Sequence, residues 1–191
     1  MKIRSSALGK IMTNPRKKSE TLSATCKTYI KELVKEDLFG YRTTIDSKYL
    51  TKGIDLEDAS IDLYNEVHNT LYLKNTERLS NEFITGECDI NAENKIIDIK
   101  TSWSLETFPA SPEDINNKAY EWQLRSSMWL YDKLKAELAY CMVSTPDYLL
   151  KDWDNYKIHK VDKHDPFLRV TTISFERDTE KEALIEQRVK D

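Results

Sequence analysis

The sequence from residue 83 to residue 102 decides the fold: Phe83-Ile84-Thr85-Gly86-Glu87-Cys88-Asp89-Ile90, a turn Asn91-Ala92-Glu93-Asn94, then Lys95-Ile96-Ile97-Asp98-Ile99-Lys100-Thr101-Ser102. Two alternating runs joined by a polar turn predict a β-hairpin. Side chains two residues apart share a strand face, so Asp98 and Lys100 lie on one face and the isoleucines between them on the other. If Ile90 pairs near Ile97, Asp89 and Asp98 become neighbours across the hairpin.

These neighbouring carboxylates indicate a cation site. Like charges opposed in a sheet repel each other unless a cation lies between them. Oxygen ligands without nearby His or Cys suit Mg²⁺ or Mn²⁺ better than Zn²⁺. Lys100, beside the carboxylates, can orient a water and stabilise charge that builds up at phosphorus. The pattern predicts metal-assisted phosphodiester hydrolysis; the alternative left open is a solvent-facing strand edge with a Lys–Asp pair.

The rest of the chain predicts a mixed α/β domain whose sheet is flanked by helices. We expect helices over residues 6–13, 21–38, 53–73 and 112–135, strands near 138–144 and 168–175, and a charged terminal helix. Few glycines and prolines argue against a flexible linker, so residues 1–191 are expected to form a single domain. Within it we distinguish a basic helical lobe (1–40), a core (53–145) and a C-terminal strand and helix (146–191).

Two polar residues on the expected helices could face the carboxylates. Glu57 heads a partly apolar helix face, although an acid in the first helical turn also interacts favourably with the helix dipole. Gln123 shares a face with Tyr120 and Ser127, and its alternative is a half-buried polar residue without chemistry. The three histidines show no ligand spacing and are interpreted as structural or surface residues. Trp103, directly after the strand, is the one tryptophan that we consider for base stacking.

Composition excludes several classes of protein. Among 191 residues, 39% are hydrophobic and 10% are aromatic, which argues against disorder. No apolar run is long enough to span a membrane, the N-terminus lacks the apolar region of a signal peptide, and the three scattered cysteines form no metal knuckle. We therefore expect a cytoplasmic protein. The net charge is −4, but residues 1–40 carry nine basic and four acidic residues, so any DNA contact is expected to be local.

Five segments together resemble a known family. Gly86-Glu87-Cys88-Asp89 with Ile97-Asp98-Ile99-Lys100 resembles the signature of the PD-(D/E)XK nuclease superfamily. Glu121-Trp122-Gln123-Leu124-Arg125 is similar to the glutamine helix of its phage lambda exonuclease/YqaJ-like branch, and Leu56-Glu57-Asp58-Ala59 resembles that branch's upstream glutamate. Ile3-Arg4-Ser5-Ser6 resembles its N-terminal helix. Cys88 stands in place of the motif's proline, and Asp98 in place of its usual glutamate.

The resemblance implies a restriction-endonuclease-like core and a role for each matched residue. Asp89, Asp98 and the Ile99 carbonyl are implied to bind Mg²⁺, for which Mn²⁺ substitutes, and Glu57 to bind a second ion or its water. Lys100 is implied to position and activate the attacking water.

Three further residues receive roles in the same way. Gln123 is implied to assist near the metal or the scissile phosphate. Ser6 and Arg4 are implied to hold a terminal 5′-phosphate of the DNA.

The implied activity is that of a Mg²⁺-dependent DNA exonuclease. It would degrade one strand of linear double-stranded DNA 5′→3′ from phosphorylated ends, with a single-strand annealing protein in phage recombination. The resemblance also implies a homo-oligomer, a trimer, in the host cytoplasm if the chain is phage-encoded. Three alternatives stay open: a RecB-like single-strand nuclease or endonuclease, a catalytically inactive DNA-binding module, and a hydrolase of another phosphate ester. A Cas4-like version is disfavoured because its iron–sulfur cluster needs four cysteines.

Overall fold

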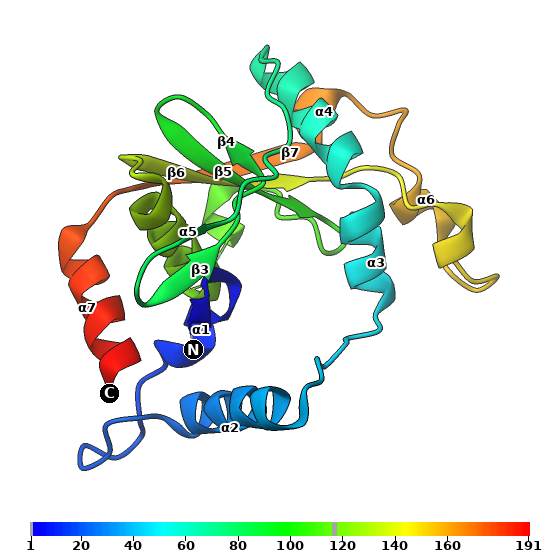
Figure 1. Cartoon of the computed structure of the whole chain (residues 1–191). Coiled ribbons are helices and arrows are strands. Elements are labelled where there is room, and N and C mark those ends of the chain that lie inside the picture. Colours follow the sequence, from blue (N-terminus) through cyan, green and yellow to red (C-terminus); the bar gives the residue numbers. More distant parts are fainter. Residues whose placement is uncertain (1, 116–117) are drawn as a thin grey trace.

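The computed structural model describes residues 2–115 and 118–191, whose strands form two sheets (Figure 1). The larger sheet is mixed, with the order β4 (Ile90–Asn91), β5 (Lys95–Thr101), β6 (Lys135–Cys141) and β7 (Val170–Glu176). In it β5 and β6 are parallel, and the other two pairs are antiparallel. The smaller sheet has the order β1 (Ile3–Arg4), β3 (Ile84–Gly86) and β2 (Leu79–Ser80). The expected mixed sheet flanked by helices is confirmed, and the smaller sheet is an addition to it.

The helices surround these sheets (Figure 1). The α-helices are α1 (Leu8–Ile11), α2 (Ala24–Phe39), α3 (Lys48–Asp55), α4 (Glu57–His68), α5 (Lys118–Tyr131), α6 (Tyr156–His159) and α7 (Thr179–Lys190). Short 3₁₀ turns are η1 (Ser5–Ala7), η2 (Pro112–Asp114), η3 (Asp147–Leu149) and η4 (Pro166–Leu168). No helix among the described residues is both long and apolar enough to cross a bilayer.

The alternation along β5 sends its side chains into two different cores. Ile97 and Ile99 pack with Tyr64 of α4, whereas Ile96 packs with Leu124 and other residues of α5. Each core buries several large side chains completely, and a side chain of this kind contributes about 1.5–3 kcal/mol when buried. Because the apolar side chains on both faces of β5 are packed in these cores, the strand cannot rotate, and the directions of Asp98 and Lys100 are fixed.

The predicted hairpin register is confirmed, but the first strand of that hairpin is shorter than expected. Ile90 pairs with Ile97 in the antiparallel β4–β5 ladder. The earlier part, β3, joins the smaller sheet instead. At Gly86 an added Cβ would lie 2.2 Å from Ser5 Oγ and 2.8 Å from Ser5 Cβ, so only glycine allows this contact. The close approach ties β3 to the N-terminus, and the chain then crosses to the larger sheet through residues 87–89.

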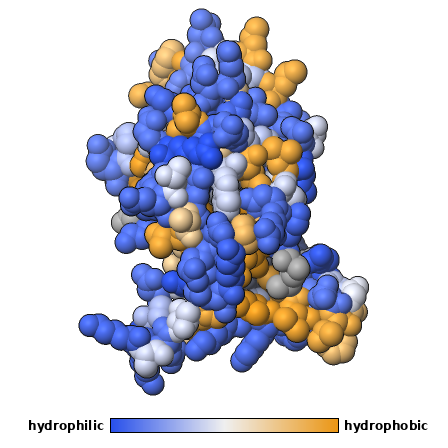
Figure 2. Space-filling model, turned by 60° about the vertical axis from the view of Figure 1, so that its left-hand side comes forward, coloured by the Kyte–Doolittle hydropathy of each residue, from blue (hydrophilic) through white to orange (hydrophobic). Residues whose placement is uncertain are grey.

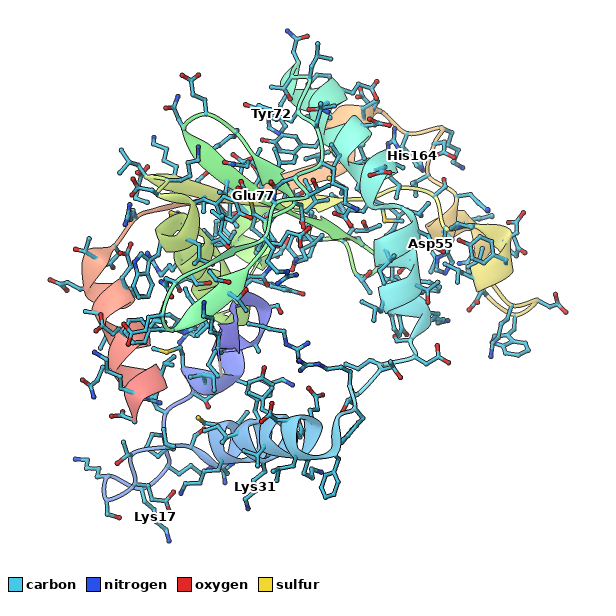
Figure 3. The ribbon with its side chains drawn as sticks, in the orientation of Figure 1. Lys17, Lys31, Asp55, Tyr72, Glu77 and His164 are labelled. Atoms are coloured by element: carbon cyan, nitrogen blue, oxygen red, sulfur yellow. The ribbon has the colours of Figure 1, made fainter. Side chains whose placement is uncertain are left out.

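Helix α2 forms the lower lobe in Figure 1 and has a cap at each end. Ser23 Oγ accepts a hydrogen bond from the Cys26 amide at 3.0 Å, and Gly40 ends the helix at φ 65°. Apolar side chains gather along the lower edge of the face shown in Figure 2. The C-terminal half of α2 exposes three large hydrophobic residues, Val34, Leu38 and Phe39. Lys17 and Lys31 lie on the side of this lobe that faces away from the sheets (Figure 3).

Several predicted boundaries are wrong. The helix expected over 53–73 is two helices, because the backbone bends at Leu56 (φ −114°, ψ 16°), and α4 ends before Asn69, which is left-handed at φ 52°. The apolar spacing continues across Leu56, so periodicity does not reveal the bend. Of the helix expected over 112–135, the structure has η2 and α5, and residues 116–117 lie outside the described residues. Strand β6 begins three residues earlier than expected.

Candidate active site

A cleft of about 750 Å³ opens where α3, α4 and α5 meet the end of β5. Its walls include six residues that the sequence singled out for chemistry: Ser6, Glu57, Asp89, Ile99, Lys100 and Gln123. Asp98 lies beneath them with 3% of its surface exposed. The structure therefore brings the expected hydrolytic residues together from four separate segments.

Asp98 is the buried centre of the site. Gln123 Nε2, reaching across from α5, donates a hydrogen bond to Asp98 Oδ1 at 2.6 Å. The other oxygen, Oδ2, forms an ion pair with Lys100 Nζ but has no hydrogen bond of good geometry among the described residues. Burial opposes the charge of Lys100, yet Asp98 and Asp89 outweigh burial and hold the pKa of its ammonium above the ordinary value. Lys100 is thus a hydrogen-bond donor rather than a proton acceptor.

Asp89 lies just before the short strand β4, and its side chain accepts a hydrogen bond from β5 beyond the end of the β4–β5 ladder. The Ile99 amide donates to Asp89 Oδ2 at 2.6 Å. In a strand the amide and carbonyl of one residue point to the same side, so the Ile99 carbonyl also faces the cleft beyond the end of β4. Burial, and then the negative charge of Asp98, raise the pKa of Asp89 well above that of an ordinary carboxyl. Burial and the charge of Asp98 therefore both disfavour the ionised form of Asp89.

Glu57 begins α4 at the edge of the cleft. Its Oε2 forms an ion pair with Lys74 Nζ at 3.0 Å, and 24% of its side chain is exposed. Helix α4 is tied to β5 by the hydroxyls of Ser60 and Thr101, which are 2.8 Å apart. This bond sets the position of Glu57 relative to the strand that carries Asp98.

A buried lysine fixes α3 to the same strand ends. Lys52 is fully buried, and its ammonium donates to three backbone carbonyls: Ser102 at 2.7 Å, Trp103 at 3.0 Å and Val143 at 2.9 Å. Burial lowers the pKa of Lys52 to about 8, with a further contribution from the charge of Lys160. Sequence reasoning missed this residue, since an isolated lysine in a helical segment is normally exposed.

The donor set fits a magnesium-like ion. No group of three or more His, Cys, Asp and Glu side chains in residues 2–115 and 118–191 is placed to hold a metal alone. Mg²⁺, however, usually keeps several waters and binds through one or two carboxylates. Asp89 and Asp98 supply two carboxylates, Asp98 Oδ2 lacks a directed hydrogen bond, and the donors are all oxygen. These residues would hold the ion together with the Ile99 carbonyl, and Glu57 lies on the wall of the same cleft.

One wall of the cleft is aromatic and apolar. The Trp103 ring meets Tyr49 edge-on at 5.1 Å between centroids, and Lys48 Nζ lies 4.4 Å from the centre of the Trp103 ring. His159, which the sequence indicated as structural, is buried edge-on against Trp103 at 5.2 Å. Base stacking by Trp103 stays a prediction.

Of the two residues expected to bind a 5′-phosphate, Ser6 is the one found in the cleft. Ser6 lines the cleft from η1, whereas Arg4 is exposed on β1 and is not among the lining residues that the structure describes. The sequence also missed Lys74 and Asn75, because the predicted helix ran to residue 73. Asn69 at the true helix end was the available signal, since asparagine tolerates a left-handed backbone.

The comparisons with known proteins agree with this geometry. Neither a scan against protein-family models nor a search of curated proteins finds a match. Among solved structures, a phage-related exonuclease from Haemophilus somnus 129PT is 35% identical with a TM-score of 0.92, covering 100% of this chain and 91% of its own. An alkaline exonuclease from Laribacter hongkongensis, LHK-Exo, is 16% identical with a TM-score of 0.68 and coverages of 99% and 84%. LHK-Exo in complex with dAMP matches equally, at 16% identity, a TM-score of 0.68 and coverages of 98% and 84%.

The two LHK-Exo structures, at 16% identity, share the fold of this chain. The 35% identity to the phage-related exonuclease over the whole chain shows that the two proteins belong to one family. The sequence motifs, the mixed sheet and the grouped acidic residues point the same way. The chain belongs to the phage lambda exonuclease/YqaJ-like branch of the PD-(D/E)XK nuclease superfamily.

Proposed function

We propose that this nuclease is a Mg²⁺-dependent exonuclease that hydrolyses one strand of linear double-stranded DNA, 5′→3′ from phosphorylated ends. The observation that carries the proposal is the placement of Asp89, Asp98 and Lys100 around one end of β5, inside a cleft that also contains Gln123 and Glu57. The 35% identical phage-related exonuclease supports the exonuclease activity, and the complex of LHK-Exo with dAMP supports DNA as the substrate.

Each residue has a definite task in this reaction. Asp89, Asp98 and the Ile99 carbonyl would hold the ion, which when bound supplies a Lewis acid that offsets negative charge on the phosphate. The Lys100 ammonium donates hydrogen bonds, so it orients the attacking water and stabilises charge that develops on the phosphate. Gln123 keeps Asp98 in place through its 2.6 Å hydrogen bond.

The surface around the cleft supports a DNA end as the substrate. Ser6 provides a hydroxyl for a terminal phosphate, and the wall built on Trp103 provides an apolar surface for a base. Lys17 and Lys31, on the far side of the basic lobe, lie away from the sheets (Figure 3) and would bind at most distant phosphates. The exposed apolar end of α2 supports association with further copies of the chain, as a ring-shaped trimer requires.

The test is end-resolved digestion of linear duplex DNA with Mg²⁺. Substrates with 5′-phosphate ends, 5′-hydroxyl ends and covalently closed circles are compared for the wild type, Lys100→Ala and Lys135→Ala. Lys135 is the matched control, because it is an exposed lysine on β6 that pairs with Glu176 at 3.3 Å.

Loss of one strand from phosphorylated ends by wild type and control, but not by Lys100→Ala, is the expected result. Cutting of closed circles would instead make the protein an endonuclease with the same metal site. An absence of any cleavage would leave DNA binding without catalysis as its activity.

A further inference from the structure

The connection between α4 and β2 contacts two acidic residues of the site, Glu57 and Asp89. Lys74 Nζ lies 3.0 Å from Glu57 Oε2. The next residue, Asn75, donates its backbone amide to the Asp89 carbonyl at 2.7 Å. Two consecutive residues thus link the start of α4 to the segment before β4, although no sequence motif marks them.

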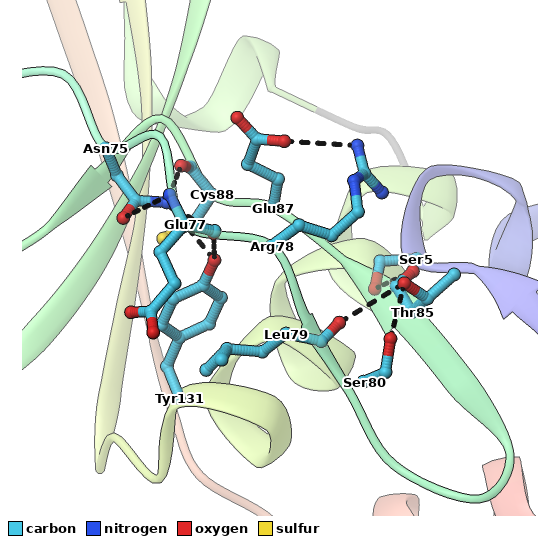
Figure 4. A network of polar contacts seen from close by, with 10 residues as sticks. All are labelled: Ser5, Asn75, Glu77, Arg78, Leu79, Ser80, Thr85, Glu87, Cys88 and Tyr131. Carbon is cyan, nitrogen blue, oxygen red and sulfur yellow. Dashed lines mark hydrogen bonds and ion pairs between the residues drawn. The ribbon is translucent and has the colours of Figure 1, made fainter.

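The side chain of Asn75 completes this connection (Figure 4). Its Nδ2 lies within hydrogen-bond distance of three oxygens: Cys88 O at 3.0 Å, Glu77 O at 3.0 Å and Tyr131 Oη at 3.1 Å. The Tyr131 hydroxyl in turn donates to the Glu77 carbonyl. Tyr131 ends α5, the helix that also carries Gln123. Asn75 therefore joins α5 to the backbone directly before Asp89.

Asp89 needs such support because of its place in the fold. Residues 87–89 lie between β3 and β4, outside both sheets, so no strand ladder fixes their backbone. Asn75 contacts the carbonyls of both Cys88 and Asp89, and it supplies the missing hydrogen bonds on that side. Residues that orient a metal ligand in this way typically account for 10–100-fold in metal affinity or activity.

We propose that Asn75 is a positioning residue that holds Asp89 in the orientation required for divalent-ion binding, with Tyr131 holding Asn75. The inference rests on the proposed function, since it presumes that Asp89 binds the ion. Asn81 provides a matched control in the neighbouring turn. Its Oδ1 accepts the amides of Phe83 and Ile84, each at 2.9 Å, and it makes no hydrogen bond with Cys88 or Asp89 among the described residues. Both asparagines fix backbone, but only Asn75 fixes the backbone of an ion ligand.

The experiment is calorimetric titration of Mn²⁺ into the folded wild type and the variants Asn75→Ala, Tyr131→Phe and Asn81→Ala. Urea midpoints of the same preparations report stability. Asn75→Ala is expected to weaken Mn²⁺ binding by about 10-fold or more, and Tyr131→Phe by about 3-fold, whereas Asn81→Ala loses stability but keeps wild-type affinity. The Mg²⁺ concentration for half-maximal cleavage should rise in the same order, with kcat at saturating Mg²⁺ within about 3-fold of wild type.

Two results would overturn the inference while leaving the proposed function intact. One is wild-type Mn²⁺ affinity in Asn75→Ala, or in Tyr131→Phe if the first variant does not fold. The other is an equal loss of affinity in Asn81→Ala, which would mean that general stability, not the position of Asp89, controls binding. Failure of the wild type itself to bind Mn²⁺ would overturn the proposed function as well.

Discussion

Each face of strand β5 presents a lysine that pairs with a carboxylate, from β6 on one face and from β5 itself on the other, and the two clusters differ in charge balance. On the face toward α4, Lys95 Nζ lies 2.8 Å from Glu137 Oε2, and Tyr64 donates to the other oxygen at 2.6 Å. At the cleft, Lys100 faces both Asp98 and Asp89. The first cluster pairs one positive with one negative charge, whereas the second sets one positive charge against two negative charges.

The cluster around Lys95 stabilises the fold, whereas the cluster around Lys100 is suited to binding a ligand. Burial and the Glu137 hydrogen bond raise the pKa of Tyr64, so its hydroxyl stays a neutral donor and both Glu137 oxygens are satisfied. At the cleft, burial and then the surplus carboxylate raise the pKa of Asp89, a cost that a bound cation would reduce. The unbalanced cluster is therefore the one suited to catalysis.

The largest expected effect separates the two lysines. Lys100→Met should lower kcat by at least about 10³-fold, because it removes the charged donor at the cleft. Lys95→Met should keep kcat within about 2-fold of wild type, although it breaks the pair with Glu137. Steady-state cleavage at saturating Mg²⁺ measures both variants. Equal losses of activity would mean that the α4 face also takes part in catalysis.

The second effect is stabilisation by the ion. At about 100 times its Kd, Mg²⁺ should raise the free energy of unfolding by about 2.7 kcal/mol in the wild type and in Glu137→Gln, but not in Asp89→Asn. Ca²⁺ should stabilise similarly without supporting cleavage, because its looser coordination misplaces the attacking water. Urea unfolding with each ion and with chelator is the measurement. Stabilisation of Asp89→Asn equal to that of the wild type would place the ion elsewhere.

The sequence predicted this two-faced strand, because alternation and turn length are local. The pairing of Ile90 with Ile97 and the shared face of Asp98 and Lys100 both follow from a period of two. Gln123 was found because the helical spacing around it holds across its neighbours. The resemblance then indicated Glu57, which local reasoning alone left open as a helix-end acid.

What the sequence did not predict depends on distant contacts. The switch of β3 into a second sheet follows from the approach of Ser5 to Gly86, which no local pattern encodes. Lys52 is buried because three carbonyls from two strand ends converge on it. Asn75 lies in an irregular connection, where neither periodicity nor composition indicates a partner.

The third expected effect is a change in the free energy of unfolding, and its sign differs between the two charged clusters. Glu137→Gln should destabilise the protein by about 2 kcal/mol, because Lys95 keeps its charge without a partner. Asp89→Asn should stabilise it by about 1 kcal/mol in chelator, because it removes one of two crowded charges while its side-chain oxygen still accepts the Ile99 amide. Chemical unfolding at neutral pH measures both, and destabilisation of Asp89→Asn would show that the carboxylates do not repel.

The pH dependence of stability tests whether charge repulsion causes the expected stabilisation of Asp89→Asn. Folding raises the pKa of Asp89, so the native state binds its proton more tightly than the unfolded state does. Wild-type stability relative to Asp89→Asn should therefore fall as the pH rises above about 4, the ordinary value for a carboxyl. A difference that does not change between pH 4 and pH 7 would exclude a charge effect.

The smallest effect concerns a hydrogen bond between α4 and the end of β5. Ser60 of α4 is fully buried, and its hydroxyl lies 2.8 Å from that of Thr101, the last residue of β5. Ser60→Ala should cost about 1 kcal/mol of stability, the usual net contribution of one hydrogen bond. Because α4 also carries Glu57, the variant should lower kcat by about 3-fold, whereas Ser127→Ala, another buried serine that lies on α5, should leave kcat unchanged. Wild-type kcat in Ser60→Ala would show that packing alone fixes α4, and that the chemistry at the cleft is independent of the balanced cluster behind it.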